Sequence, residues 1–164
     1  HNRAPRVGLL SIGEEEHKGN DLTRSVTPLL KALPIKFIGN VEGRDIYSGA
    51  ADVVVCDGFI GNVALKVSEG MAEMMLHKIS HDVMSELTHE KHVAGAAFHR
   101  VGRRYSYHES GGAPLLGVDG ICMICHGSSN GHSILNALRR AVEFQDRRIN
   151  PLIVEELAAC PIGS

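Results

Sequence analysis

Short apolar runs alternate with longer amphipathic segments along this chain. Three runs have the length and composition of buried strands, and they span residues 7–12, 35–38 and 52–56. A near-continuous apolar run that ends in glycine or polar residues is typical of a strand buried on both faces, as in a parallel sheet. The pattern therefore predicts three buried strands, each followed by a loop at its carboxyl end.

The segments between and after these strands have helical spacing. One helix is predicted after a cap at Asn20 or Asp21, and Pro28 inside it should kink or split it. A long helix is predicted from Asn62 onward. Further along, we expect a strand over 120–125, a helix over 133–144 and a short helix that Asn150 caps. The stretch 89–109 has the weakest pattern, and we expect a helix there followed by an irregular segment that leads back toward the rest of the fold.

This alternation predicts one α/β unit over residues 1–164, an open, mostly parallel sheet covered on both faces by helices. The length fits a single core. The chain does not open with Met, and its first residues lead at once into a strand. We therefore expect it to be part of a longer protein.

Composition narrows the classes of function. The net charge of −2 argues against a nucleic-acid binder, which would be clearly basic. No apolar run reaches the roughly 18 residues that a membrane-spanning helix needs. Three of the four cysteines, Cys56, Cys122 and Cys125, lie in or beside apolar strands, where thiols usually stay reduced and buried. A cytoplasmic protein is the favoured interpretation.

The loop after the strand at 120–125 is the main candidate for chemistry. His126, Gly127, Ser128 and Ser129 lead directly into a helix. Small residues at such a junction leave backbone N–H groups open to an anion, most often phosphate. The alternative is that Gly127 makes a tight turn while the two serines cap the helix.

A second junction of the same kind follows the strand at 52–56. Asn62 and Lys66 are four residues apart, so they share one helix face, and Lys66 could reach an anion. The alternative is a solvated surface lysine. Because ligands of parallel sheets bind at the carboxyl ends of the strands, we expect both junctions to converge on one edge.

Several other patterns are weaker. Residues 122–126 match the haem-attachment pattern, but an apolar strand is the wrong context, and a zinc site would need a second cysteine pair. The histidine pairs at 77/81 and 89/92 fit a solvated helix face, so no metal is predicted. Arg100, Arg103 and Arg104 belong to a basic stretch, either an ordinary surface or a docking patch for an acidic partner or an anionic membrane.

Five sequence blocks, in order over nearly the whole chain, carry a family resemblance. They are RVGLLSIGEE at 6–15, FIGNVEGRDI at 37–46, ADVVVCDGF with the following Gly61 and Asn62 at 51–62, GGAPLLG at 111–117 and HGSS at 126–129. Together they resemble the C-terminal half of the bacterial phosphate acyltransferase family of phospholipid synthesis, called PlsX. Asn130 stands where many members have Asp, and Pro28 and the stretch 89–104 also depart from the family pattern.

The resemblance implies transfer of a fatty acyl group from acyl-[acyl carrier protein] to inorganic phosphate, which gives acyl phosphate for phosphatidic acid synthesis. It also implies an α/β/α sandwich like that of phosphotransacetylases and isocitrate dehydrogenases, and no cofactor. The implied partners are a second copy in a homodimer, the cytoplasmic membrane in peripheral contact, and the downstream glycerol-phosphate acyltransferase. Groups from the N-terminal half would complete the site.

Residue types suggest roles within that reaction. Gly127, Ser128 and Ser129 would bind phosphate, with Asn62 and Lys66 completing the site. Residues assigned to catalysis are His126, Ser129 and Lys66, with His126 donating to the developing oxyanion or orienting the loop. Arg100, Arg103 and Arg104 would dock the acidic carrier protein.

Two alternatives remain open at this point. One is an oxidoreductase that uses a dinucleotide, although the chain has no G-x-G-x-x-G at a helix start. The other is a non-catalytic phosphate-binding or dimerisation fragment.

Overall fold

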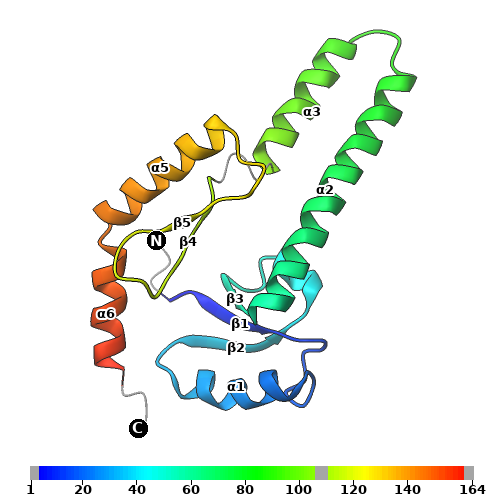
Figure 1. The fold of residues 1–164 in the computed structure, drawn as a ribbon. Helices are drawn as coiled ribbons and strands as arrows, with labels where there is room; N and C mark the ends of the chain where they lie inside the picture. Colours follow the sequence, from blue (N-terminus) through cyan, green and yellow to red (C-terminus); the bar gives the residue numbers. More distant parts are fainter. Residues whose placement is uncertain (1–3, 106–110, 161–164) are drawn as a thin grey trace. The chain divides into compact units, whose positions relative to one another are not determined.

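The structure is a computed structural model that describes residues 4–105 and 111–160. Its contacts divide the chain into two compact units, residues 1–67 and 68–164. Figure 1 shows the elements of each unit. The single unit expected from the sequence stays a prediction.

The first unit is built on a three-stranded parallel sheet. Its strands are β1 (Arg6–Leu10), β2 (Lys36–Val41) and β3 (Val53–Val55), in the order β2-β1-β3. Helix α1 (Asp21–Ala32) connects β1 to β2 and packs against both (Figure 1). A short 3-10 helix, η1 (Gly43–Ile46), lies between β2 and β3. The three predicted strands and the parallel α/β arrangement are confirmed.

Helix α1 is continuous, so the expectation that Pro28 splits it is wrong. Proline removes one backbone hydrogen bond from a helix interior. Bonds in the preceding turns hold this segment. Asn20 Oδ1 accepts from the backbone N–H of Thr23 at 2.9 Å, and the buried Thr27 hydroxyl donates to the carbonyl of Thr23 at 2.9 Å.

An ion pair ties the first strand to the start of the third. The backbone N–H of Arg6 and its side-chain Nε donate to Asp52 Oδ2 at 2.8 and 3.0 Å, and the N–H of Asp52 donates back to the Arg6 carbonyl at 2.9 Å. Hydrogen bonds from the Arg6 side chain and then its backbone lower the pKa of Asp52 from its ordinary 3.8 to about 2. This pair fixes the edge on which β3 joins the sheet.

We expect this pair to make stability depend on acid pH. Because the pKa of Asp52 is lower in the folded state than in the unfolded state, its ionised form stabilises the fold above about pH 4. That contribution is lost as the pH falls from about 4 to about 2. Thermal melting across this range should show a flatter pH dependence for Asp52→Asn than for the natural protein. Asp119→Asn changes an exposed carboxylate and is the control, which should keep the pH dependence of the natural protein. Equal slopes for Asp52→Asn and the natural protein would contradict the assignment.

The second unit begins within the long helix α2 (Gly58–Glu86), which spans the boundary between the units. It continues with α3 (Lys91–Tyr105), which confirms a helix in the poorly legible stretch 89–109. A Cβ added at Gly102 would lie 3.0 Å from Leu76 Cδ2, and one at Gly95 would lie 3.9 Å from Met84 Cε. The two helices therefore run antiparallel, with glycines of α3 against large side chains of α2 (Figure 1).

The rest of the second unit consists of β4 (Ala113–Pro114), β5 (Met123–Ile124), α5 (Gly131–Asp146) and α6 (Ile149–Ala159). The strand expected over 120–125 is shorter than predicted and is not part of the parallel sheet. It pairs antiparallel with β4, and the N–H of Leu115 continues the ladder to the carbonyl of Cys122 at 2.8 Å. The glycine-containing loop between them turns the chain back, which favours the local antiparallel pair.

Two helix starts also differ from the sequence prediction. Helix α5 begins at Gly131 rather than at 133, because Asn130 caps it. Helix α6 begins at Ile149 after Arg148, whose backbone is left-handed, so Asn150 is inside the helix and donates to the carbonyl of Gly120 at 2.6 Å. In the described residues, no helix is both long and apolar enough to cross a membrane.

Candidate functional site

The junction between β3 and α2 begins with a capping carboxylate. Asp57 Oδ1 accepts the backbone N–H groups of Phe59 at 3.0 Å and Ile60 at 2.9 Å. Asp57 is therefore the N-cap, and the helix begins at Gly58, four residues before the predicted start. A carboxylate already occupies the positive end of this helix, where an incoming anion would otherwise bind.

Asn62 and Lys66 are the fifth and ninth residues of α2, and both are exposed. At 1.5 Å per residue, Lys66 lies roughly 12 Å along the axis from Gly58. The four-residue spacing still places both side chains on one face. An anion held by these two residues would lie beside the helix rather than at its N-terminus.

The loop between β5 and α5 is a compact turn held by its own polar groups. The N–H of Ser129 donates to the carbonyl of His126 at 3.0 Å, and the N–H of His126 donates to Ser129 Oγ at 3.1 Å. The N–H of Ser128 donates to His126 Nδ1 at 3.2 Å, and Ser128 Oγ lies 2.6 Å from the same nitrogen. These bonds order the loop, so phosphate would have to exchange with some of them or bind the hydroxyls and Gly127.

The bonds at His126 select its tautomer. Because Nδ1 accepts the N–H of Ser128, a neutral ring carries its proton on Nε2. The imidazole therefore presents Nε2–H as a donor, as oxyanion stabilisation would require. Orientation of the loop and donation by the ring are compatible in this arrangement.

The serines do not cap α5. Asn130 Oδ1 accepts from the N–H and the hydroxyl of Ser133 at 3.0 and 3.1 Å, and Ser133 is buried. The alternative in which Ser128 and Ser129 are the helix caps is therefore wrong. The amide oxygen of Asn130 therefore caps α5.

The candidate site residues fall in both units. Asn62 and Lys66 belong to residues 1–67, and His126 through Ser129 belong to residues 68–164. Their convergence on one phosphate stays a prediction. Arg100 and Arg103 are exposed on α3, three residues apart and therefore on one face, and Arg104 lies in the same helix.

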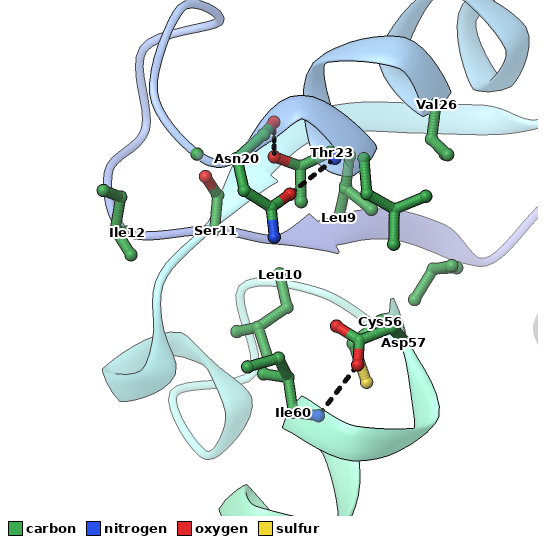
Figure 2. Close-up of a pocket in the computed structure, with 13 residues that line it drawn as sticks. Leu9, Leu10, Ser11, Ile12, Asn20, Thr23, Val26, Cys56, Asp57 and Ile60 are labelled. Atoms are coloured by element: carbon green, nitrogen blue, oxygen red, sulfur yellow. Dashed lines mark hydrogen bonds between the residues drawn. The ribbon is translucent and has the colours of Figure 1, made fainter.

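Sequence reasoning missed a pocket of about 420 Å³ in the first unit (Figure 2). It lies beyond the carboxyl ends of β1 and β3 and beside the first turns of α1 and α2. Its lining is mostly apolar and consists of Leu9, Leu10, Ser11, Ile12, Gly19, Asn20, Leu22, Thr23, Val26, Val55, Cys56, Asp57 and Ile60. The signal in the sequence was weak, because Leu22 and Val26 fit the core-facing side of a helix equally well.

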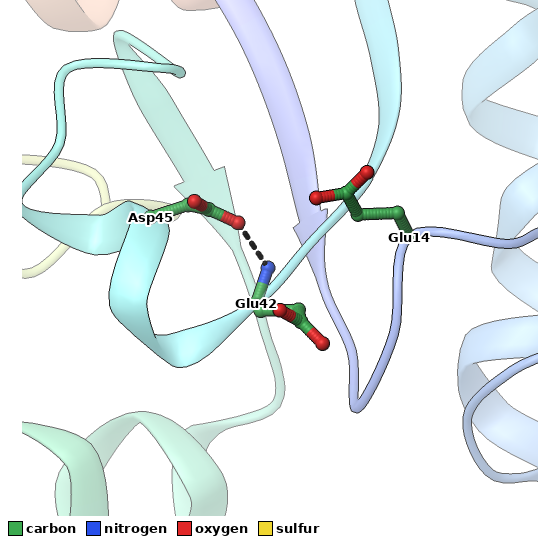
Figure 3. Close-up of side chains that lie close together, drawn as sticks. All are labelled: Glu14, Glu42 and Asp45. Carbon is green, nitrogen blue, oxygen red and sulfur yellow. Dashed lines mark hydrogen bonds between the residues drawn. The ribbon is translucent and has the colours of Figure 1, made fainter.

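A cluster of carboxylates lies elsewhere in the first unit. Oxygens of Glu14, Glu42 and Asp45 come within 4.8 Å of one another (Figure 3). Arg44 lies 2.6 Å from Glu42 and 3.6 Å from Glu14, and Asp45 Oδ2 accepts the backbone N–H of Glu42 at 2.8 Å. Arginine pairing and the capping of η1 account for this cluster without a metal.

Comparison with known proteins adds the family. The model of a family described as "Fatty acid synthesis protein" matches residues 1–151. Phosphate acyltransferase of Acidobacterium capsulatum is 52% identical over 157 residues, which cover 94% of this chain and 47% of that protein. Phosphate acyltransferase of Geotalea uraniireducens is 50% identical over 93% of this chain and 45% of its own length. The chain spans about half the length of the curated relatives it matches.

Proposed function

The chain belongs to the fatty acid synthesis protein family, and on that premise we propose that the protein containing it is a phosphate acyltransferase. Its reaction would transfer a fatty acyl group from acyl-[acyl carrier protein] to inorganic phosphate, giving acyl phosphate for phosphatidic acid synthesis. The observation that carries the proposal is the 52% identity over 94% of the chain with a protein named phosphate acyltransferase. No observation on the chain favours the dinucleotide oxidoreductase.

The chemistry asks for positioning more than for strong acid or base catalysis. A phosphate oxygen attacks the thioester carbonyl carbon, a C–O bond forms, and the C–S bond breaks with its electron pair leaving on sulfur. The thiolate then takes a proton from solvent. Holding both reactants in line can contribute up to about 7–11 kcal/mol. A donor aimed at the developing oxyanion contributes further.

The residues of this chain would divide these tasks. The hydroxyls of Ser128 and Ser129 and the backbone of Gly127 would contact phosphate, and Lys66 with Asn62 would offset its charge. His126 would present Nε2–H to the oxyanion, with Ser128 fixing the ring through Nδ1. Groups from the remaining half of the protein would complete the site.

The proposal includes a homodimer and peripheral contact with the cytoplasmic membrane, where the glycerol-phosphate acyltransferase would take up acyl phosphate. Its support is the large apolar side chains that α2 exposes within the second unit: Met71, Met74, Met75, Ile79 and Val83. Sedimentation equilibrium and flotation with anionic vesicles address both parts. A monomer that stays with the aqueous fraction would contradict them.

We expect the full-length enzyme to convert acyl-[acyl carrier protein] to acyl phosphate in a phosphate-dependent reaction, measured as free carrier thiol and as acyl hydroxamate. Arg100→Glu should raise the carrier KM by roughly fivefold, because an exposed ion pair contributes up to about 1 kcal/mol. It should leave the phosphate KM unchanged. Reversal of this charge would repel the acidic carrier protein.

Arg139→Glu provides the matched control, since Arg139 is an exposed arginine on α5 of the same unit. If both reversals change the carrier KM equally, the effect is one of net charge and the docking patch is disproved. Absence of acyl phosphate with every acyl donor would disprove the enzymatic function itself and leave the non-catalytic fragment as the surviving alternative.

A further inference from the structure

The pocket of the first unit is placed where α/β folds bind ligands. It opens beyond the carboxyl ends of β1 and β3, and residues of α1 and α2 form its walls (Figure 2). Seven aliphatic side chains line it: Leu9, Leu10, Ile12, Leu22, Val26, Val55 and Ile60. Leu9 is buried at 3% exposure, whereas Ile12 and Leu22 are 79% and 51% exposed. Large exposed aliphatic groups around a concave surface indicate an apolar occupant.

Asn20, Thr23 and Asp57 of the lining are already engaged with the protein, whereas the buried hydroxyl of Ser11 has no hydrogen-bond partner among the described residues. Asn20 Oδ1 accepts the N–H of Thr23, and the hydroxyl of Thr23 donates to the carbonyl of Asn20 at 3.0 Å (Figure 2). Asp57 Oδ1 accepts the two N–H groups at the start of α2. A carboxylate at this position repels a phosphate or a second carboxylate. The electrostatics therefore oppose an anionic ligand and favour an uncharged, apolar one.

The volume suits a chain of methylene groups. A pocket of about 420 Å³ is within the range of roughly 300–1,000 Å³ that small-molecule sites occupy. With roughly 30 Å³ for each water-sized group, it has room for about fourteen of them. A long acyl chain is of that size.

We infer that this pocket holds the fatty acyl chain of the substrate and that Val26 limits the length of chain it accepts. The inference rests on the proposed function, because it takes the acyl donor from there. Helix α1 returns antiparallel to β1, so Val26 is farther from the carboxyl edge of the sheet than Asn20 or Ile12. The chain would enter at the edge with Ile12 and end near Val26, leaving its thioester at the carboxyl edge of the sheet.

The test enlarges the side chain at the deep end. In the full-length enzyme, Val26→Phe should lower kcat/KM for palmitoyl-[acyl carrier protein] at least about tenfold relative to octanoyl-[acyl carrier protein]. Leu29→Phe is the matched control, because Leu29 is exposed on the same helix but does not line the pocket. It should keep the chain-length preference of the natural enzyme. An unchanged palmitoyl-to-octanoyl ratio in Val26→Phe would overturn the inference.

A second readout separates this inference from the proposed function. Binding of methyl cis-parinarate, an uncharged fluorescent fatty acyl ester, needs no catalysis, and Val26→Phe should weaken it at least about tenfold while Leu29→Phe does not. If the natural enzyme forms no acyl phosphate but shows this binding difference, the pocket stands and the function fails. If it binds no methyl cis-parinarate although it is active, another segment fills the pocket and the inference is overturned. Should Val26→Phe fail to fold, Val26→Leu replaces it, since it adds only one methylene group at the same position and should change the palmitoyl-to-octanoyl ratio in the same direction by less.

Discussion

Replacing Lys66 with alanine in the full-length enzyme should raise the phosphate KM by about tenfold to a hundredfold and leave the carrier KM unchanged. A hydrogen bond to a charged group contributes about 1.5–3 kcal/mol, and each 1.4 kcal/mol is a factor of ten. Lys66 is exposed on the face of α2 that it shares with Asn62. Initial rates at varied phosphate and fixed acyl-[acyl carrier protein] measure the effect.

Lys78→Ala is the control for this change, because Lys78 is an exposed lysine of the same helix with no assigned role. It should leave the phosphate KM unchanged. Ser129→Ala should also raise the phosphate KM, but it removes the acceptor for the N–H of His126, so its effect includes disorder of the turn. If Lys66→Ala and Lys78→Ala behave alike, Lys66 is a solvated surface lysine and its place in the site is lost.

Replacing Gly112 with alanine should destabilise the second unit by about 2 kcal/mol or more. Gly112 has a φ of +97°, where L side chains are strained, and a Cβ there would lie 2.5 Å from the carbonyl oxygen of Ile124. The strain alone costs of order 1–3 kcal/mol, and the clash with backbone adds to it. The change would force apart β4 and β5, which precede the candidate phosphate loop. Urea unfolding of the full-length protein measures the loss.

Gly117→Ala separates the two causes. Gly117 also has a positive φ of +82°, but no atom lies within 4 Å of a Cβ built there. Its substitution should cost only the conformational strain, roughly 1–2 kcal/mol. Equal losses for the two variants would mean that the close approach of Gly112 to β5 does not contribute.

The predicted strands of the first unit were found because their signal is local. Apolar runs at 7–12, 35–38 and 52–56 became β1, β2 and β3 with small shifts at their ends. The start of α2 was missed although the sequence contained its signal, since Asp57 is a strong N-cap residue directly before Gly58. The effect of Pro28 was predicted wrongly because side-chain bonds in the preceding turns hold α1 together.

The pairing partner and direction of the fourth expected strand, at 120–125, could not be predicted from its own residues. An apolar run such as 120–125 fits a parallel sheet or a hairpin equally well. Its antiparallel partner β4 contains only Ala113 and Pro114, which carry no strand pattern. Pairing of this kind depends on how the intervening loop folds back.

The candidate site, like the fold, was predicted from the sequence only in part. The composition of the His126–Ser129 loop predicted a polar turn, and its serines and histidine do bond to one another. The prediction did not include the Asp57 carboxylate that blocks the start of α2 or the pocket that aliphatic residues from four elements enclose. The pocket depends on contacts between segments distant in the chain, whereas the capping by Asp57 is local and was overlooked.

The position of inorganic phosphate in a crystal of the full-length enzyme tests the central claim most directly. Bound phosphate should contact the hydroxyls of Ser128 and Ser129, with Lys66 Nζ within about 3 Å of a phosphate oxygen. Phosphate bound elsewhere, with Lys66 and the Ser128 turn on separate surfaces of the enzyme, would contradict the account.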